Sequence, residues 1–207
     1  MGVNIIWQGQ FCFQISTSQR KNSQTSILID PNSLNLKKSG FKPDILLFTH
    51  HSKLENVTEQ TFLIDGPGEY EIKEVFIQGV PTSNNKTTIY SLDSEAMRIC
   101  HLGNINQKEL TSDQLEKIGN VDILMIPVGD VDVISAKEAM RIISQIEPKV
   151  IIPMYYRIPK AKVELENLNN FLKIMGRESP DILDKLKISK KDLPKEEAKI
   201  VVLKPQC

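Results

Sequence analysis

The stretch Asp44-Ile45-Leu46-Leu47-Phe48-Thr49-His50-His51-Ser52 carries the strongest signal in the chain. It begins as a buried-strand run, ends that run on Thr49, and delivers two adjacent histidines to a loop. Histidines on a loop at a strand end are placed where a metal-hydrolase centre could form, because imidazole is a common zinc ligand. The residues that follow, Ser52, Leu54 and Glu55, are mostly not the ligand types that such a centre needs. The stretch therefore predicts a catalytic scaffold that lacks most of its metal ligands.

The composition is that of an ordinary globular protein: of 207 residues, 40% are hydrophobic and 25% are charged. The 26 basic residues balance the 26 acidic residues, so no net charge draws the chain toward nucleic acid or an anionic membrane. Cys12, Cys100 and Cys207 are odd in number and widely spaced, which predicts neither a disulfide framework nor a zinc finger. Without a signal-type N-terminus or an apolar stretch of about 20 residues, we expect a cytoplasmic protein.

The two halves of the chain differ in hydrophobic period. The first half predicts short strands separated by turn residues, over 3–7, 11–15, 26–29, 44–48, 62–65, 74–78, 87–92 and 96–101. The second half alternates strands over 121–128, 150–154 and 200–203 with helices that begin near Thr111 or span 135–146 and 165–175. Gly66-Pro67-Gly68 predicts a tight turn, and the lysine-rich segment 185–199 predicts a solvated face. This order suits a layered sandwich of sheets covered by helices.

Several segments, in this order and spacing, resemble the metallo-β-lactamase superfamily. They are Trp7-Gln8-Gly9-Gln10-Phe11-Cys12-Phe13, Leu28-Ile29-Asp30-Pro31, Thr49-His50, Asp65-Gly66-Pro67-Gly68-Glu69-Tyr70-Glu71-Ile72, Ile99-Cys100-His101-Leu102-Gly103-Asn104, Asp122-Ile123-Leu124-Met125-Ile126-Pro127-Val128-Gly129 and Ile152-Pro153-Met154-Tyr155-Tyr156. The chain is most similar to the branch of small stand-alone metal-dependent hydrolases that includes ascorbate-phosphate lactonases. The resemblance implies an α/β (α+β) fold, an αββα four-layer sandwich over a single domain of residues 1–207. It also implies an active site at one edge of the two sheets.

The ligand pattern of that family is only partly present. Its hydrolases carry Thr or Ser and then His-x-His-x-Asp-His after a strand, and these side chains hold two metals. His50 matches the first histidine, whereas Ser52 replaces the second, Leu54 replaces the aspartate and Glu55 replaces the last histidine. The resemblance therefore implies that most of this ligand set has been lost.

Three further motifs of the family also lack the residue that the family uses at the metal site. The His-x-Gly-Asp motif, whose aspartate bridges the metals, is His101-Leu102-Gly103-Asn104 here. Tyr155 occupies the slot of the final histidine, and Gln10 replaces the histidine of the opening Trp-x-Gly-His. A neutral amide is a poor bridging ligand, and two divalent ions repel each other without nearby negative charge. We expect no cofactor, or zinc or another divalent metal if a reduced site survives.

Simpler roles compete with a functional one at each remaining residue. His50 and His51 could form a remnant site with Glu55, but adjacent residues on a strand-like path point opposite ways. We expect His101 to bond backbone, Glu69 to serve a turn or a solvated strand, and Tyr155 to fill the space that the metals left. We also expect Leu54 to lie near Tyr155.

The leading hypothesis is a metallo-β-lactamase-fold protein that acts as a non-catalytic binding, regulatory or scaffold protein. Its vestigial pocket would comprise His50, His51, Ser52, Leu54, Glu55, Glu69, His101, Asn104 and Tyr155. The alternative is a hydrolase of a phosphorylated or lactone-type small molecule that uses one weakly held ion. The partner would be a small molecule or a protein, with no nucleic acid and no membrane.

Overall fold

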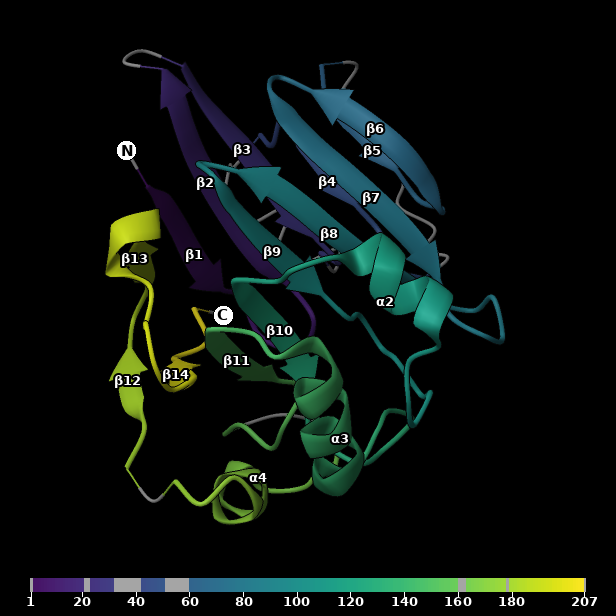
Figure 1. The fold of residues 1–207 in the computed structure, drawn as a ribbon, viewed down its shortest axis with the longest axis vertical. Coiled ribbons are helices and arrows are strands. Elements are labelled where there is room, and N and C mark those ends of the chain that lie inside the picture. Colours follow the sequence, from purple (N-terminus) through teal and green to yellow (C-terminus); the bar gives the residue numbers. More distant parts are fainter. Residues whose placement is uncertain are drawn as a thin grey trace.

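The computed structural model describes residues 2–20, 23–31, 42–50, 60–159, 163–177 and 179–206. Two β-sheets pack face to face, one with the strand order β13-β1-β2-β3-β4-β5 and one with the order β12-β14-β11-β10-β9-β8-β7-β6 (Figure 1). The first sheet comprises β1 (Val3–Trp7), β2 (Phe13–Arg20), β3 (Ser23–Ile29), β4 (Ile45–Leu47), β5 (Phe62–Ile64) and β13 (Leu186–Ile188). The second comprises β6 (Gly68–Ile72), β7 (Val75–Pro81), β8 (Thr88–Ser94), β9 (Met97–His101), β10 (Ile123–Pro127), β11 (Val150–Met154), β12 (Asp181–Leu183) and β14 (Lys199–Leu203).

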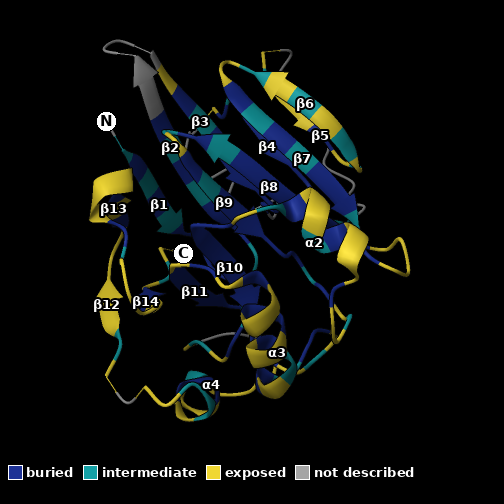
Figure 2. Cartoon of the chain, viewed as in Figure 1, coloured by how far each residue is buried: buried dark blue, intermediate teal, exposed yellow. Residues whose placement is uncertain are grey.

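The strands follow the burial that their sequences predict. Val3, Ile5 and Trp7 are fully buried at alternate positions of β1, so one face of this strand packs into the core between the sheets. Every residue of β10 and β11 is buried, because these parallel strands have the core on one face and helices on the other (Figure 2). The strands predicted over 121–128 and 150–154 are therefore confirmed, and both are buried on two faces.

Three helices, α2 (Ser112–Ile118), α3 (Ala136–Ile146) and α4 (Leu168–Ile174), lie on the side of the eight-stranded sheet (Figure 1). The first two begin with capping boxes, in which a Thr or Ser side chain and a residue three positions on satisfy each other's backbone N–H groups. The helix predicted to start at residue 165 begins three residues later, at Leu168, after the N-cap Asn167.

The outer face of the six-stranded sheet is covered as well. Leu28 and Leu46 alternate with core residues of β3 and β4, so their side chains point away from the sheet interface. With Cys12 and Phe48 they form a second buried cluster. This architecture is the αββα four-layer sandwich that the sequence predicts. In the part of the chain that is described, no helix is long and apolar enough to span a membrane.

Two short strands were not predicted from the sequence. Residues 68–72 form the strand β6 after the predicted turn, and its half-buried residues alternate with the exposed Glu69 and Glu71. The segment 185–199 is not simply a solvated face, because Leu186 and Ile188 are buried in β13, which pairs with β1. Because lysines alternate with apolar residues here, the charge pattern predicted a solvated face and not a short strand.

Candidate functional site

The predicted site residues that the structure describes come from strand ends of both sheets. His50 follows β4, His101 ends β9 and Tyr155 follows β11. The two sheets are joined at this edge by hydrogen bonds, including one from the Thr88 N–H to the Thr49 carbonyl oxygen at 2.7 Å. The edge therefore gathers loops that are far apart in sequence, as an active site of this architecture requires.

Asp30 anchors the loop that carries the first histidine. Its carboxylate accepts hydrogen bonds from the Thr49 N–H at 2.8 Å and from the Thr49 hydroxyl at 2.6 Å. His50 Nδ1 lies 3.7 Å from the same carboxylate, and the His50 side chain is 39% exposed. Burial raises the pKa of Asp30 to about 6, although the Thr49 hydrogen bonds and the nearby His50 oppose this shift. Both carboxylate oxygens are thus engaged within the protein.

His101 is completely buried and both of its ring nitrogens are used. Nδ1 accepts a hydrogen bond from the Gly103 N–H at 3.0 Å, so Nε2 carries the proton and donates to the Phe11 carbonyl oxygen at 2.9 Å. Burial lowers the pKa of His101 to about 4, with His50 contributing in the same direction. His101 is a neutral structural histidine, as the sequence predicts, and it offers no lone pair to a metal.

Gly103 packs against the other sheet, whereas Asn104 is held by Thr87, the residue before β8 of its own sheet. The Asn104 Oδ1 accepts a hydrogen bond from the Thr87 hydroxyl at 2.7 Å. Gly103 has a φ of 60°, and a Cβ atom at this residue would lie 2.5 Å from the Thr49 Cβ. The loop after β9 therefore packs directly on the threonine that precedes His50, and the amide in the slot of the bridging aspartate has a protein partner.

Tyr155 stacks on Phe11. Their ring centroids are 4.1 Å apart with an interplanar angle of 16°, and the Phe11 ring meets the His50 ring edge-on at 6.5 Å. Tyr155 is half-buried with a φ of 52°, a left-handed conformation that is uncommon for a residue other than glycine. The residue in the slot of the final histidine thus packs against an aromatic neighbour from the loop between β1 and β2.

Four of the predicted residues, His51, Ser52, Leu54 and Glu55, lie outside the described residues, so the expected contact between Leu54 and Tyr155 stays a prediction. Glu69 is exposed on β6, where it pairs with Gln78 of β7.

Sequence reasoning missed the supporting residues Asp30, Phe11 and Thr87. In the sequence, Asp30 stands out only as part of a family segment and has no assigned role, yet it is a buried carboxylate that binds the loop before His50. A carboxylate at the end of a strand, next to a strand that ends in histidine, was the available signal. Gln10, in the slot of the opening histidine, has a buried Oε1 without a hydrogen-bond partner.

The described residues do not fit a dinuclear metal centre. Among them, no group of three or more His, Cys, Asp or Glu side chains is close enough to hold an ion. His101 is saturated, Asn104 is a bonded amide, and Tyr155 is a stacked phenol. Zinc centres need about three imidazole, thiolate or carboxylate ligands. Among the described residues in the family's ligand slots, His50 alone is a histidine, as the pattern requires.

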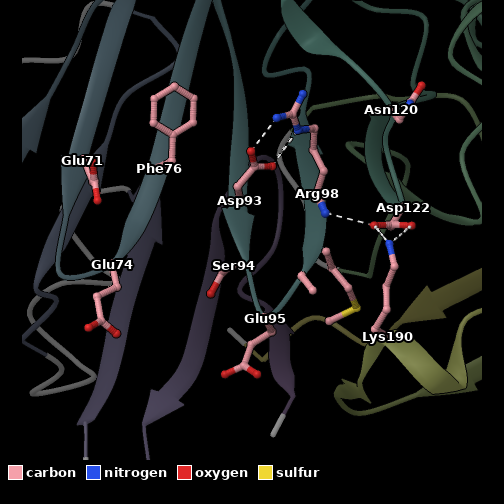
Figure 3. Close-up of a pocket in the computed structure, with 12 residues that line it drawn as sticks. Glu71, Glu74, Phe76, Asp93, Ser94, Glu95, Arg98, Asn120, Asp122 and Lys190 are labelled. Atoms are coloured by element: carbon pink, nitrogen blue, oxygen red, sulfur yellow. Dashed lines mark hydrogen bonds and ion pairs between the residues drawn. The ribbon is translucent and has the colours of Figure 1, made fainter.

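A separate cavity of about 590 Å³ opens at the other end of the eight-stranded sheet (Figure 3). It is lined mainly by charged side chains, among them Asp93, Arg98, Asp122 and Lys190. None of the predicted site residues lines it.

A family model described as a β-lactamase superfamily domain matches residues 4–155 of the chain. The chain belongs to this superfamily. Two curated relatives, UPF0173 proteins of Pyrococcus furiosus and Pyrococcus abyssi, are each 26% identical over 185 residues, covering 74% of this chain and 83% of theirs.

Solved structures of superfamily members share the fold. A proposed zinc-dependent hydrolase of the metallo-β-lactamase superfamily from Thermotoga maritima is 30% identical, with a TM-score of 0.81, over 97% of this chain and 98% of that chain. Igni18, a metallo hydrolase from Ignicoccus hospitalis, is 14% identical with a TM-score of 0.62, over 91% of this chain and 99% of its own. The second likeness concerns the fold alone.

Proposed function

We propose that this chain is a superfamily member that holds no dinuclear metal centre and serves in the cytoplasm as a non-catalytic binding, regulatory or scaffold protein. One observation carries the proposal: apart from Gln10, whose buried Oε1 has no hydrogen-bond partner, the buried polar groups described at the site edge bind one another. Asp30 is engaged by Thr49, Asn104 by Thr87, and His101 by Gly103 and Phe11. Buried polar groups that are paired in this way do not need a metal to satisfy them.

The substitutions support the same proposal through their charge. A pair of divalent ions requires nearby carboxylates, and the family pattern would supply them at the positions of Leu54 and Asn104. The ligand of such a binding protein would be a small molecule or another protein. The net charge of zero gives no support for a nucleic-acid partner.

Metal content is the direct test. The protein is purified without chelator and its zinc, iron and manganese are measured by elemental analysis, alongside activity on generic phosphodiester and lactone substrates. We expect well under one ion per chain and no turnover. Close to two tightly bound ions per chain would overturn the proposal.

A restored variant provides the matched positive control. It carries Ser52→His, Leu54→Asp, Glu55→His, Asn104→Asp and Tyr155→His together, because metal ligands act as a unit and their effects do not add. Metal uptake by this variant, but not by the natural chain, would attribute the difference to these five positions. A single Leu54→Asp substitution that by itself brought in a tightly bound zinc would contradict the proposal.

The second candidate function is a hydrolase of a phosphorylated or lactone-type small molecule that uses one weakly held ion. The geometry of His50 favours it, because the exposed ring keeps a carboxylate 3.7 Å from Nδ1, as many metal-binding histidines do. A melting temperature that falls by many degrees with a strong chelator, together with turnover of either substrate class, would select this candidate.

A further inference from the structure

The outermost strand of the six-stranded sheet, β5, exposes large apolar side chains. Phe62 is 49% exposed and Leu63 is 45% exposed. Consecutive strand residues point to opposite faces, so this edge offers an apolar side chain on each face of the sheet. The strand pairs with β4 on one side and ends the sheet on the other.

The backbone of β5 also has hydrogen-bonding groups on its open side. The Phe62 N–H donates to the Asp44 carbonyl oxygen at 2.8 Å, and the Ile64 carbonyl oxygen accepts from the Phe48 N–H at 2.9 Å. Alternate residues of a strand bond in opposite directions, so the N–H and C=O of Leu63 face away from β4. An edge with such groups is a template for another strand.

The edges of the two sheets differ in how they are protected. Three of the four terminal strands in the described part of the chain carry exposed charged residues: Glu69 and Glu71 on β6, Asp181 on β12, and Lys187 on β13. Charged side chains on an edge strand discourage pairing with another chain. The strand β5 is Phe62-Leu63-Ile64 and carries none.

The charges around β5 indicate what could cover it. Asp65 follows the strand directly. Only three residues separate β5 from β6, and this short link keeps the exposed Glu69 of β6 near the same end of β5. At the other end, Lys73 forms an ion pair with Asp44, which neutralises both charges. The end of β5 near Asp65 is therefore acidic. A second copy paired through this edge would bring its own acidic residues close to these.

We propose that β5 is a docking edge for an extended apolar segment of a partner protein, with basic residues at the end that meets Asp65. The partner would pair with the Leu63 backbone and cover Phe62 and Leu63. This inference goes beyond the proposed function, because it requires no ligand in the vestigial pocket and holds whatever the metal content is. Strand addition to a free edge is a common mode of peptide recognition.

Labelled synthetic peptides test this directly by fluorescence anisotropy with the full chain. The probes share the core Val-Thr-Val-Thr-Val and carry Lys-Lys at the N-terminal or the C-terminal end; matched probes carry Glu-Glu instead. We expect a Lys-Lys probe to bind at least tenfold more tightly than its Glu-Glu counterpart. Asp65→Lys should remove that preference. Absence of binding by all probes, or equal binding of both kinds, would overturn the proposal.

Two lysine substitutions locate the binding edge. Leu63→Lys should weaken the Lys-Lys probe at least tenfold, whereas Ile182→Lys, on the exposed edge strand β12, should leave it unchanged. Both side chains are exposed, and thermal melting checks that both variants fold. If Ile182→Lys weakened binding and Leu63→Lys did not, β5 would not be the docking edge. Concentration-dependent dimerisation abolished by Leu63→Lys would overturn the proposal in favour of a second copy.

Discussion

Polar residues at the two ends of the eight-stranded sheet have different kinds of interaction partners. At the end that carries the vestigial pocket, His101 and Asn104 are neutral and form hydrogen bonds with uncharged partners. At the opposite end, Asp93 pairs with Arg98, and Asp122 accepts a hydrogen bond from Lys190 at 2.8 Å (Figure 3). Asp122 also accepts a hydrogen bond from Lys149 at 2.9 Å.

The difference lies in how each end stabilises its buried polar groups. Burying a charge is costly unless an opposite charge lies close to it. Burial opposes the ionisation of Asp122, but Lys190 and Lys149 outweigh it and lower the pKa of this carboxylate. At the candidate site edge, the residues in the family's ligand slots, Asn104 and Tyr155, are neutral, so no opposite charge is needed beside them. One end thus depends on ion pairs with lysine and arginine, and the other on packing and on hydrogen bonds from uncharged donors, including those from Thr49 to the Asp30 carboxylate.

The largest effect should come from the packing at the vestigial edge. Gly103→Ala would force a side chain into a left-handed conformation and place its Cβ 2.5 Å from Thr49. We expect a loss of about 2–5 kcal/mol in the free energy of unfolding, measured by urea denaturation, from backbone strain plus overpacking. Gly176→Ala is the control, because its φ of 65° is similar but no atom lies within 4 Å of the added Cβ. Equal losses in both variants would show that the packing on Thr49 contributes nothing.

The neutral hydrogen bonds at the same edge give the next test. His101→Phe would leave the Gly103 N–H and the Phe11 carbonyl oxygen without partners in a buried site. The expected cost is about 2–4 kcal/mol, read from the shift in the urea midpoint. His50→Phe, at a 39% exposed ring, should cost less than about 1 kcal/mol. A cost for His101→Phe as small as that of His50→Phe would mean that the two bonds do not hold this edge together.

Hydrophobic period was enough to predict most of the fold. The runs that became β10 and β11 are buried on both faces, and Thr111 and Ser135 supply the helix caps that their sequences indicate. Strands such as β13 were missed because three residues with a central lysine carry almost no periodic signal. Short edge strands are fixed by the neighbour with which they pair, which a local pattern does not contain.

The sequence indicated which residues to look for at the site, but not the contacts that hold them. The ligand substitutions could be recognised from the spacing of the motifs, and the backbone role of His101 was anticipated. The carboxylate of Asp30 and the stacking of Phe11 on Tyr155 were not, because each depends on loops from strands that are distant in sequence. Contacts between loops of two sheets follow from tertiary packing and leave no local signature.

Two buried groups at the site edge, His101 and Asp30, should make the stability of the protein depend on pH. The pKa of His101 is lowered to about 4, so stability is lost as the pH falls from about 6.5 to 4, where only the unfolded chain binds the proton. The pKa of Asp30 is raised to about 6, so its contribution has the opposite sign: stability rises as the pH falls from about 6 to about 4. The two contributions offset each other in the natural chain.

Asp30→Asn should expose the histidine contribution. Relative to the natural chain, this variant should lose about 2–3 kcal/mol more stability between pH 7 and pH 4.5, measured by urea denaturation at each pH. His101→Phe should change the pH dependence in the opposite direction. If both variants kept the pH profile of the natural chain, neither buried group would titrate as the structure indicates.

The smallest effect is expected at the charged end of the sheet. Asp122→Asn would remove the charge between Lys149 and Lys190, but both lysines are about half-exposed and can return to water. The expected cost is about 1–2 kcal/mol at neutral pH and low salt. Because the pKa of Asp122 is lowered, this stabilisation is present above the pKa of the unfolded carboxyl and disappears as the pH falls through the folded value. The difference in the free energy of unfolding between the variant and the natural chain should therefore shrink in acid and in 1 M salt.

Asp181→Asn is the control, because Asp181 and Lys199 form an exposed pair that should contribute less than about 0.5 kcal/mol. A salt-independent loss for Asp122→Asn larger than that of His101→Phe would reverse the contrast between the two ends, with buried charge rather than neutral bonding as the stronger constraint.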